Sequence, residues 1–255
     1  MTAIRGLYTL WIREVKRYLR DHVRILSSFV TPLLWLVIFG TGVRLALPYA
    51  GLNYLSYIFP GIVGQTLLFT SMFMGISVLW DREFGFMKEI LVAPIARVWV
   101  FMGKMFGDST DAVIQGIIVF VLGALLGIKL NIFTFLESLP LMLLITFGLV
   151  SIGLTIASFM GSLEGFGSIQ SFINLPLFFL SGALFPLRGS GIPTWLQIAS
   201  RLDPLTYGVD ALRNVILGSA WTPFQVQSLW VDIGIIAAFD LIMMTIGTWA
   251  FTKMK

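Results

Sequence analysis

Long stretches without charge dominate the hydrophobic pattern of this chain. Residues 25–43 contain no charged side chain, and residues 45–80 form a second uncharged run. One membrane-spanning helix needs about 20 apolar residues, so the first run fits one span and the second is too long for a single helix. Prolines and glycines interrupt its first half, which predicts a loop followed by a span at 56–79.

Four further apolar runs continue this pattern. In addition to 25–43 and 56–79, we predict spans at residues 108–128, 138–160, 167–187 and 229–251. The expected fold is therefore an all-α integral membrane protein with six transmembrane helices. It divides into an N-terminal segment, residues 1–24, and a transmembrane domain, residues 25–255.

The N-terminal segment has an amphipathic pattern. At about 100° per residue, a helix over residues 3–22 gathers apolar side chains on one face and basic side chains on the other. The apolar face contains Ile4, Leu7, Tyr8, Trp11, Val15, Tyr18 and Leu19, and the basic face contains Arg13, Lys16, Arg17, Arg20 and Arg24. Such an amphipathic interfacial helix places its aromatic rings at headgroup depth and its cations near anionic lipid. It serves either as a simple anchor or also as a contact for a partner subunit, through residues such as Trp11, Arg13, Arg17 and Tyr18.

The connection between the second and third predicted spans, residues 81–104, is the most informative loop. Residues 84–92 predict a short helix, with Arg82, Glu83, Lys88 and Glu89 as charged contacts. Pro94 ends it, because the residue before a proline avoids helical geometry. A short helix between two spans can transmit a push from a soluble partner to the membrane. The alternative is a solvated loop whose cations only fix the orientation of the protein.

Residues 188–228 form a long connection that is not hydrophilic. Asp203 followed by Pro204 predicts a helix start, because a carboxylate caps the first turn and proline suits its first position. Apolar residues then repeat at helical spacing, and residues 192–199 predict another short helix. Apolar helices in a connection must be buried, so we expect short re-entrant helices between spans five and six.

Basic residues are distributed unevenly between the two sides of the predicted bundle. Six lie within residues 1–24, four within residues 81–104 and two at the C-terminus, against five on the opposite side. The positive-inside rule places both termini in the cytoplasm of a multi-pass protein of the inner (plasma) membrane. An even number of spans agrees with this orientation.

Composition excludes several classes of protein. Hydrophobic residues make up 57% of the chain and charged residues 12%, which leaves too little polar surface for a soluble enzyme or a nucleic-acid-binding domain. The sequence has no cysteine, a single histidine (His22), no phosphate-binding loop and no cluster with metal-ligand spacing. We therefore predict no catalytic, cofactor-binding or metal site in this chain.

Asp240 is the ionisable residue inside the last predicted span. A charge within a membrane is costly and is a functional candidate by default. Asp240 therefore opens the alternative of an ion-coupled secondary transporter, although a protonated or hydrogen-bonded structural aspartate explains it equally well. Gln170 and Asn174, in the fifth predicted span, are expected to form hydrogen bonds between helices.

A series of short motifs resembles permeases of the ABC type-2 exporter family, close to its daunorubicin-resistance and nodulation-factor export branch. The motifs are Phe59-Pro60-Gly61; Arg82-Glu83, Gly85, Lys88-Glu89, Leu91 and Ala93-Pro94-Ile95; Phe178 to Leu187; Ile192-Pro193 with Trp195-Leu196; and Asp203-Pro204-Leu205-Thr206-Tyr207. Each motif alone has low specificity, but their order and spacing cover almost the whole chain. Asp203 stands where the family more often has asparagine, and either residue caps a helix.

The resemblance implies a mechanism and a set of partners. Two such permease subunits, expected to be identical, pair with two copies of a separate ATPase subunit that binds the ATP and Mg. The coupling helix seated on the ATPase would involve Arg82, Glu83, Gly85, Lys88, Glu89, Leu91 and Pro94. The pathway would lie at the interface between permease subunits, lined by spans one, two and five, and the outer re-entrant region would include Pro186, Pro193, Trp195, Asp203, Pro204 and Tyr207.

Substrates implied by this resemblance are amphipathic molecules, such as drugs, lipids or lipid-linked glycans, exported from the cytoplasm or the inner leaflet. Two other functions stay open from the residues alone: an ion-coupled secondary transporter using Asp240, and a non-transporting membrane scaffold. Transport that follows an ion gradient without ATP would identify the first. Failure to move any candidate substrate after reconstitution would identify the second.

Overall fold

The computed structural model describes residues 3–42, 54–92, 95–188 and 192–254, and the elements in these ranges are helical. The helices are α1 (Ala3–Arg20), α2 (His22–Gly42), α3 (Tyr54–Met74), α4 (Ile76–Glu83), α5 (Phe86–Val92), α6 (Arg97–Leu125), α7 (Ile132–Phe159), α8 (Leu163–Leu180), α9 (Thr194–Leu202), α10 (Pro204–Leu217) and α11 (Leu229–Lys253). The predicted all-α fold is confirmed. The predicted loop that precedes α3 lies largely outside the described residues.

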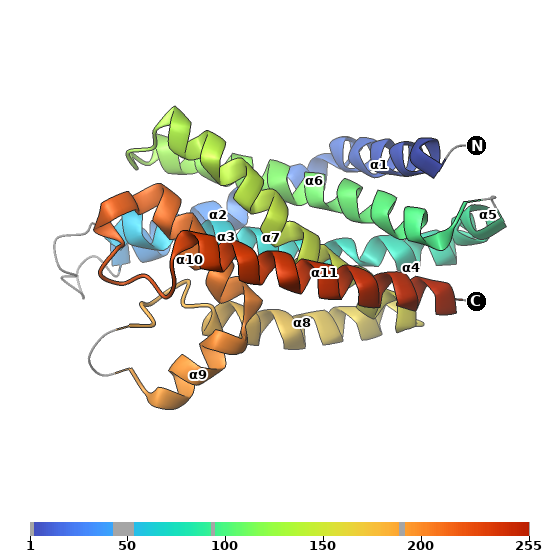
Figure 1. Cartoon of the computed structure of the whole chain (residues 1–255). Helices are drawn as coiled ribbons and strands as arrows, with labels where there is room; N and C mark the ends of the chain where they lie inside the picture. Colours follow the sequence, from blue (N-terminus) through green and yellow to red (C-terminus); the bar gives the residue numbers. More distant parts are fainter. Residues whose placement is uncertain (1–2, 43–53, 93–94, 189–191, 255) are drawn as a thin grey trace.

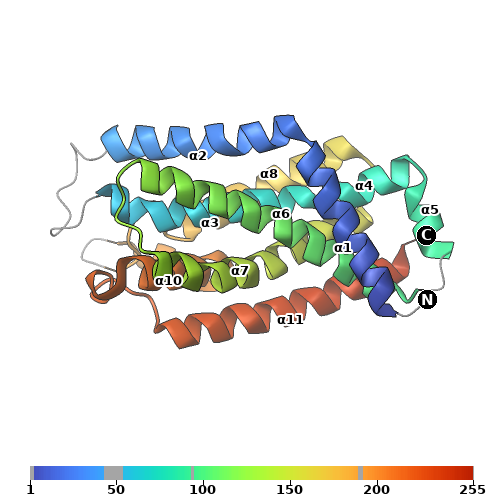
Figure 2. The same cartoon turned by 90° about the horizontal axis from the view of Figure 1, so that it is seen from above.

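The long helices run side by side along one axis of an elongated bundle (Figure 1). Both chain termini and α5 lie at one end of this bundle, and α9 and α10 lie toward the other. Seen from above, α1 crosses obliquely over α6 at the end that carries the termini (Figure 2). This arrangement matches the expectation that the N-terminal helix, the loop after the second span and the C-terminus share one side.

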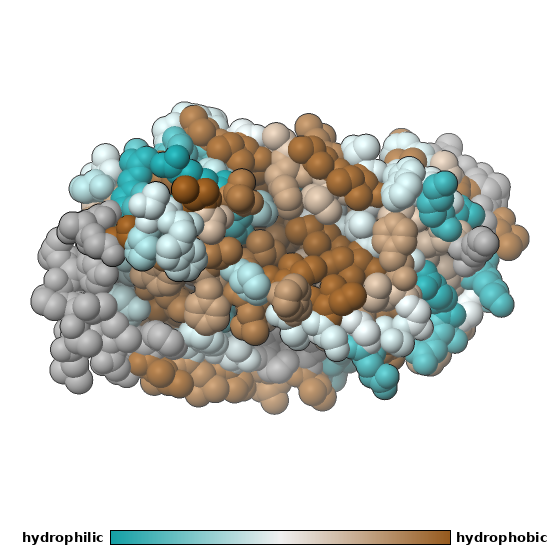
Figure 3. Space-filling model, turned by 90° about the horizontal axis from the view of Figure 1, so that it is seen from below, coloured by the Kyte–Doolittle hydropathy of each residue, from teal (hydrophilic) through white to brown (hydrophobic). Residues whose placement is uncertain are grey.

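Four stretches of helix are long and apolar enough to cross a membrane: Tyr54–Glu83, Arg97–Leu125, Ile132–Phe159 and Leu229–Lys253. The first of these joins α3 and α4 across Gly75. α2 contains a shorter apolar stretch, Phe29–Ile38, so the six-span count remains a prediction for α2 and α8. Figure 3 shows apolar side chains over the middle of one face, with hydrophilic side chains gathered toward the two ends.

Two helix boundaries differ clearly from those that the sequence predicts. α6 begins at Arg97 rather than at residue 108, and α8 ends at Leu180 rather than at residue 187. The early start of α6 brings Lys104 inside the helix, where its side chain is buried. A prediction based on apolar runs excludes such a residue from the span, because it treats a lysine as facing water.

Glycines allow the central helices to approach closely. A β-carbon on Gly153 of α7 would lie 2.7 Å from the carbonyl oxygen of Met72 in α3, and one on Gly75 would overlap the carbonyl of Gly153. Small residues at a crossing let helix backbones pack without an intervening side chain. α3 and α4 are therefore pressed against α7 at the point where the first long span bends.

α10 begins as the sequence predicts. The Asp203 side chain accepts a hydrogen bond from the backbone N–H of Leu205 at 2.9 Å, and Pro204 takes the first helical position. Most of the helix is buried against α3, α7 and α11, which is unusual for a connection between two long helices. The cap and the apolar spacing fix where this buried helix starts.

Candidate functional site

The elbow between α4 and α6, which we define as residues 83–92, exposes apolar and charged side chains together. Phe84 is 73% exposed and Val92 is 85% exposed, and Glu83, Lys88 and Glu89 are also exposed. Exposed aromatic and aliphatic groups among charges are typical of a surface that binds another protein. The side chain of Leu91, and Pro94, lie outside the described part of the chain.

Gly85 makes the sharp turn that separates α5 from α4. Its φ of 80° lies in the left-handed region, where a residue with a β-carbon is strained. The side chain of Met87 is buried and anchors α5 to the bundle. The backbone conformation alone therefore explains why a glycine occupies position 85.

Two arginines connect this end of the bundle to the ends of other helices. Arg82 donates hydrogen bonds to the carbonyl oxygens of Met160, at 2.7 Å, and Ser158, at 3.0 Å, where α7 ends. Arg97, at the start of α6, donates to three carbonyls at the end of α11, including that of Thr252 at 2.7 Å. A cation at a helix C-terminus satisfies its free carbonyls and its negative dipole end. Arg82 is thus engaged within the chain, whereas the neighbouring Glu83, Lys88 and Glu89 are exposed.

A buried ion network lies directly behind the elbow. Lys104 of α6 is fully buried, and its Nζ lies 2.5 Å from Asp81 Oδ2 and 3.1 Å from Glu14 Oε1. Arg13 contacts both carboxylate oxygens of Asp81, and Arg17 lies 2.9 Å from Glu14 Oε2. The network therefore joins α1, α4 and α6 through side chains that are largely removed from solvent.

A neutral group extends the network to a further carboxylate. Lys104 donates to the hydroxyl of Ser77 at 3.2 Å, and that hydroxyl faces Asp108 at 3.5 Å. With Arg13 and Arg17 counted beside Lys104, three cations face the three carboxylates of Glu14, Asp81 and Asp108. This balance matters because an uncompensated charge in such a place is far more costly than a paired one.

Two glycines on α6 let α1 reach this network. A β-carbon on Gly103 would lie 2.8 Å from the β-carbon of Leu10, and one on Gly107 would lie 2.6 Å from the β-carbon of Glu14. The Nε1–H of Trp11 also donates to the hydroxyl of Thr110 at 3.0 Å. The G-x-x-x-G spacing on α6 therefore lets α1 pack directly against the α6 backbone. We call this surface, formed by Gly103 and Gly107, the glycine seat.

The side chains expected to contact lipid from the N-terminal helix instead contact the bundle. Arg13 and Arg17, expected near anionic lipid, pair with Asp81 and Glu14, while Tyr18 is 2% exposed. No pattern in the sequence indicates a role for Glu14 or Asp81 themselves. One signal was available, namely the glycines four residues apart that flank a lysine inside an apolar helix.

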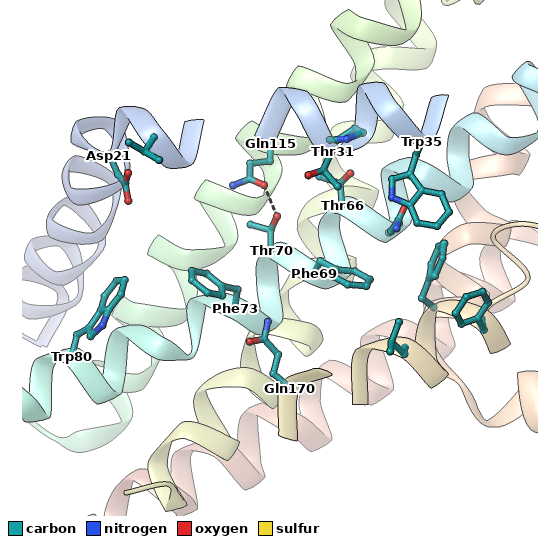
Figure 4. Close-up of a pocket in the computed structure, with 16 residues that line it drawn as sticks. Asp21, Thr31, Trp35, Thr66, Phe69, Thr70, Phe73, Trp80, Gln115 and Gln170 are labelled. Carbon is teal, nitrogen blue, oxygen red and sulfur yellow. Dashed lines mark hydrogen bonds between the residues drawn. The ribbon is translucent and has the colours of Figure 1, made fainter. Parts of the chain in front are cut away.

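A cavity of about 660 Å³ lies between α2, α3 and α8. Its walls carry aromatic rings from all three helices, including those of Trp35, Phe69 and Phe178. Neutral polar side chains also reach it: Thr31, Gln65, Thr66, Thr70, Gln115 and Gln170. Figure 4 shows Thr70 and Gln115 meeting beside the cavity, with Asp21 and Trp80 apart from each other toward the left of the view.

The expected outer region is also held by buried polar contacts. Arg213 of α10 donates to the carbonyl of Ala183 at 2.8 Å and lies over the rings of Tyr57 and Trp221. Asp210 accepts from the Trp221 Nε1–H at 2.6 Å and from two backbone N–H groups of the loop before α11. These contacts fix α10 against α3 and the following loop.

The residues that the resemblance places in the outer re-entrant region, around α9 and α10, differ in how far they are exposed. Trp195 is 66% exposed and Pro193 is exposed, whereas Pro186 and Pro204 are half-buried. Tyr207 is buried and its hydroxyl donates to the carbonyl of Arg201 at 2.7 Å. Burial raises the pKa of Asp203 to about 8, although its backbone hydrogen bond opposes that shift.

Asp240 lies on α11 against α7, away from the described lining of the cavity. Its side chain is 4% exposed, and its Oδ1 occupies the space that a β-carbon on Gly148 would need. The structure therefore explains why residue 148 is a glycine, and it places the Asp240 carboxyl in a helix contact. Gln170, expected to bond between helices, instead lines the cavity, while Asn174 is buried.

Comparison with known proteins extends over nearly the whole chain. Residues 5–217 match the family described as ABC-2 type transporter. A protein of Cyanophora paradoxa named transport permease ycf38 is 31% identical over 252 residues, which cover 94% of this chain and 86% of the relative. Nodulation protein J of Rhizobium leguminosarum bv. trifolii is 26% identical over 226 residues, which cover 86% of this chain and 85% of the relative.

Proposed function

The chain belongs to the ABC-2 type transporter family, and from this premise we propose that it is the membrane-spanning permease subunit of an ATP-driven exporter. In this proposal two copies of the chain assemble with two copies of a separate ATPase subunit, which binds the ATP and Mg. The complex moves an amphipathic substrate out of the cytoplasm or the inner leaflet. The chain itself performs no hydrolysis.

The proposed topology has six spans, with both termini in the cytoplasm and the protein in the plasma membrane. α2 and α8 supply the two spans beyond the four stretches that are long and apolar enough. Exposed apolar side chains on both helices, such as Leu34 and Phe172, support contact with lipid or another subunit. α9 and α10 are the proposed re-entrant helices at the outer end.

The elbow is the proposed docking point for the ATPase, and its attachment to the bundle is the observation that carries the proposal. Phe84, Glu89 and Val92 project from the end that bears the termini. The buried ion network and the Arg82 cap connect this elbow to α1, α6 and α7. A push on α5 would therefore pass to α4, which α5 contacts, and from α4 to three other helices through short polar contacts.

The cavity between α2, α3 and α8 is the proposed entry to the substrate pathway. These helices are the first, second and fifth spans of the proposed topology. Phe69, Leu175 and Phe179 line the cavity and keep a third or more of their surface exposed. A second copy of the chain seated on this face would complete the pathway.

We expect Glu89→Lys to weaken binding of the ATPase by roughly tenfold, because it reverses a charge at the centre of the docking surface. The measurement is co-purification of the nucleotide-binding subunit with this chain, followed by titration of the two purified proteins. Lys129→Glu, an exposed charge reversal outside the elbow, is the matched control.

Three other outcomes would redirect the proposal. Equal binding by the two variants would remove the elbow as the docking point. Binding without export of any amphiphile would indicate a scaffold. Export without ATP that follows a proton gradient, and that Asp240→Asn abolishes, would indicate an ion-coupled transporter.

A further inference from the structure

The cavity between α2, α3 and α8 has a polar stripe whose chemistry specifies more than an amphipathic substrate. Gln65, Thr66 and Thr70 lie on α3, Gln115 reaches the cavity from α6, and each is less than 9% exposed. Thr31 and Gln170 add polar groups from α2 and α8. Four helices therefore place neutral hydrogen-bonding side chains around one space.

Part of this polar stripe is already paired and part is open. Thr66 donates to the carbonyl of Ile62 at 2.9 Å, and Thr70 donates to Gln115 Oε1 at 2.5 Å. The Thr70 bond fixes the orientation of the Gln115 amide, as Figure 4 shows. It leaves the NH₂ group of Gln115 as a donor, and within the described part of the chain the Gln65 amide has no internal hydrogen bond. Each amide offers donors and an acceptor.

Charge is nearly absent from the same space. Of the described residues that line the cavity, Asp21 alone is ionisable, and it lies to one side, apart from the Thr70–Gln115 pair (Figure 4). A charged group that moves from water into an apolar site without a counter-ion loses hydration that nothing there replaces. A neutral group with hydroxyls or amides loses less, because the glutamine side chains supply replacement hydrogen bonds.

Aromatic rings form the remaining walls. Phe178 packs edge-on against Trp35 of α2 and Phe69 of α3, with ring centroids 5.6 Å and 6.2 Å apart. Phe73 and Phe179 extend this apolar lining. The rings suit an acyl chain or a flat apolar body, which a small polar molecule lacks.

We propose that this cavity selects amphiphiles whose head group is uncharged and both donates and accepts hydrogen bonds. In this proposal Gln65 and Gln115 form hydrogen bonds with that head group. This inference rests on the proposed exporter function and narrows its substrate class. The proposal disfavours amphiphiles of either charge, because the described residues along the polar stripe include no counter-ion for a phosphate or an ammonium.

The test uses the complete complex of this chain and its ATPase in proteoliposomes. Four probes are compared: fluorescent glucosylceramide, phosphatidylglycerol and a trimethylammonium lipid with the same acyl chain, and a free disaccharide. Export and stimulation of ATP hydrolysis are both measured. We expect glucosylceramide to be moved at least about tenfold faster than either charged lipid, and the disaccharide to have no effect.

Variants of Gln115 separate hydrogen bonding from size. Gln115→Met keeps the volume and removes the amide, so export of glucosylceramide should fall by about tenfold. Gln115→Glu adds a carboxylate of nearly the same shape and should raise export of the trimethylammonium lipid relative to glucosylceramide. Gln225→Met, in the loop before α11, is the matched control and should change neither rate.

The possible results distinguish the two proposals. If no probe is exported and none stimulates ATP hydrolysis, the exporter function itself fails. If charged lipids are exported as fast as glucosylceramide, or both Gln115 variants behave like Gln225→Met, exporter function stands and this substrate class is wrong. Stimulation by the free disaccharide alone would also overturn it, since the aromatic walls would then have no part in recognition.

Discussion

A lysine buried within a long apolar helix must be neutralised by its neighbours, and Lys104 is neutralised by carboxylates from two other helices. Its ammonium contacts Asp81 on α4 and Glu14 on α1. Such a network adds little net stability compared with apolar residues of equal volume, but removal of Lys104 leaves three carboxylates with two cations, Arg13 and Arg17. The main contribution of this network is therefore to specify how α1, α4 and α6 pack against one another.

We expect Lys104→Met to lower the stability of the protein by about 3–5 kcal/mol, because Glu14 and Asp81 lose their buried counter-ion. Thermal unfolding in detergent, followed by size-exclusion chromatography, measures the effect. Lys16→Met, on the exposed side of α1, removes a cation of the same kind and should change the midpoint little. Equal midpoints for the two variants would show that the network is not coupled to folding.

Asp203 gives a prediction with a defined pH dependence. Its pKa in the folded protein is about 8, above the ordinary value of 3.8, so the folded state retains a proton that the unfolded state releases. Stability from this group is complete below pH 3.8 and is lost as the pH rises through 8. Asp203→Asn keeps the helix cap but cannot titrate.

The asparagine variant should therefore lose less stability than the parent between pH 5 and pH 9, with its largest advantage above about pH 8. The unfolding midpoint at several pH values measures this difference. Asp203→Ala, which removes the cap as well, should be less stable than the asparagine variant by about 1 kcal/mol. Parallel pH profiles for parent and asparagine variant would contradict the assigned shift.

Contacts between helices explain how the interfacial helix becomes part of the bundle. α1 packs along α6 over Gly103 and Gly107, and its polar side chains complete the network behind the elbow. An amphipathic pattern alone is typical of a helix that rests on lipid. The glycine seat makes that helix part of the bundle, in direct contact with α6, the helix that follows α5.

We expect Gly107→Ala to loosen α1, because the new methyl group would overlap the Glu14 side chain and overpacking costs about 1–3 kcal/mol. Hydrogen exchange of the α1 amides should become faster in this variant. Gly234→Ala is the matched control, since a β-carbon at that helical glycine meets no neighbouring atom. Unchanged exchange in α1 would mean that α1 and α6 can separate without loss.

Much of this element structure is predictable from the sequence, and the exceptions share one cause. The start of α10 at Asp203-Pro204 and the helix over residues 84–92 follow from capping and proline rules, which are local. The start of α6 and the partners of Arg13 do not, because they depend on charges that neutralise each other across sequence separations of 68 and 90 residues. Gln170 is similar: whether it bonds to a helix or lines a cavity is decided by α2 and α3.

The whole molecule has two firmly connected ends and a less polar centre. The buried ion network and the two arginine caps lie at the end of the termini, and the Asp210 and Arg213 contacts hold α10 toward the opposite end. Between them lies the cavity of α2, α3 and α8. This division suits a permease in which force enters at one end and a gate operates at the other.

The proposed topology can be tested directly because the chain contains no cysteine. Single cysteines at Lys88 and Lys253 should react with a membrane-impermeant maleimide only in inverted vesicles. Cysteines at Lys129 and Ser219, which are exposed at other connections, should react only in right-side-out vesicles. Any pair within one group that labels from opposite sides would rule out six spans.

The distance in sequence between the members of the ion network has a consequence for biogenesis. Glu14 leaves the ribosome long before Lys104, which lies 90 residues later. Until α6 has been inserted, the carboxylate has no buried cation, and α1 has no glycine seat. The packing of α1 against α6 therefore forms only after α2, α3, α4 and α5 have been synthesised, and until then the polar face of α1 lacks its partners in the bundle.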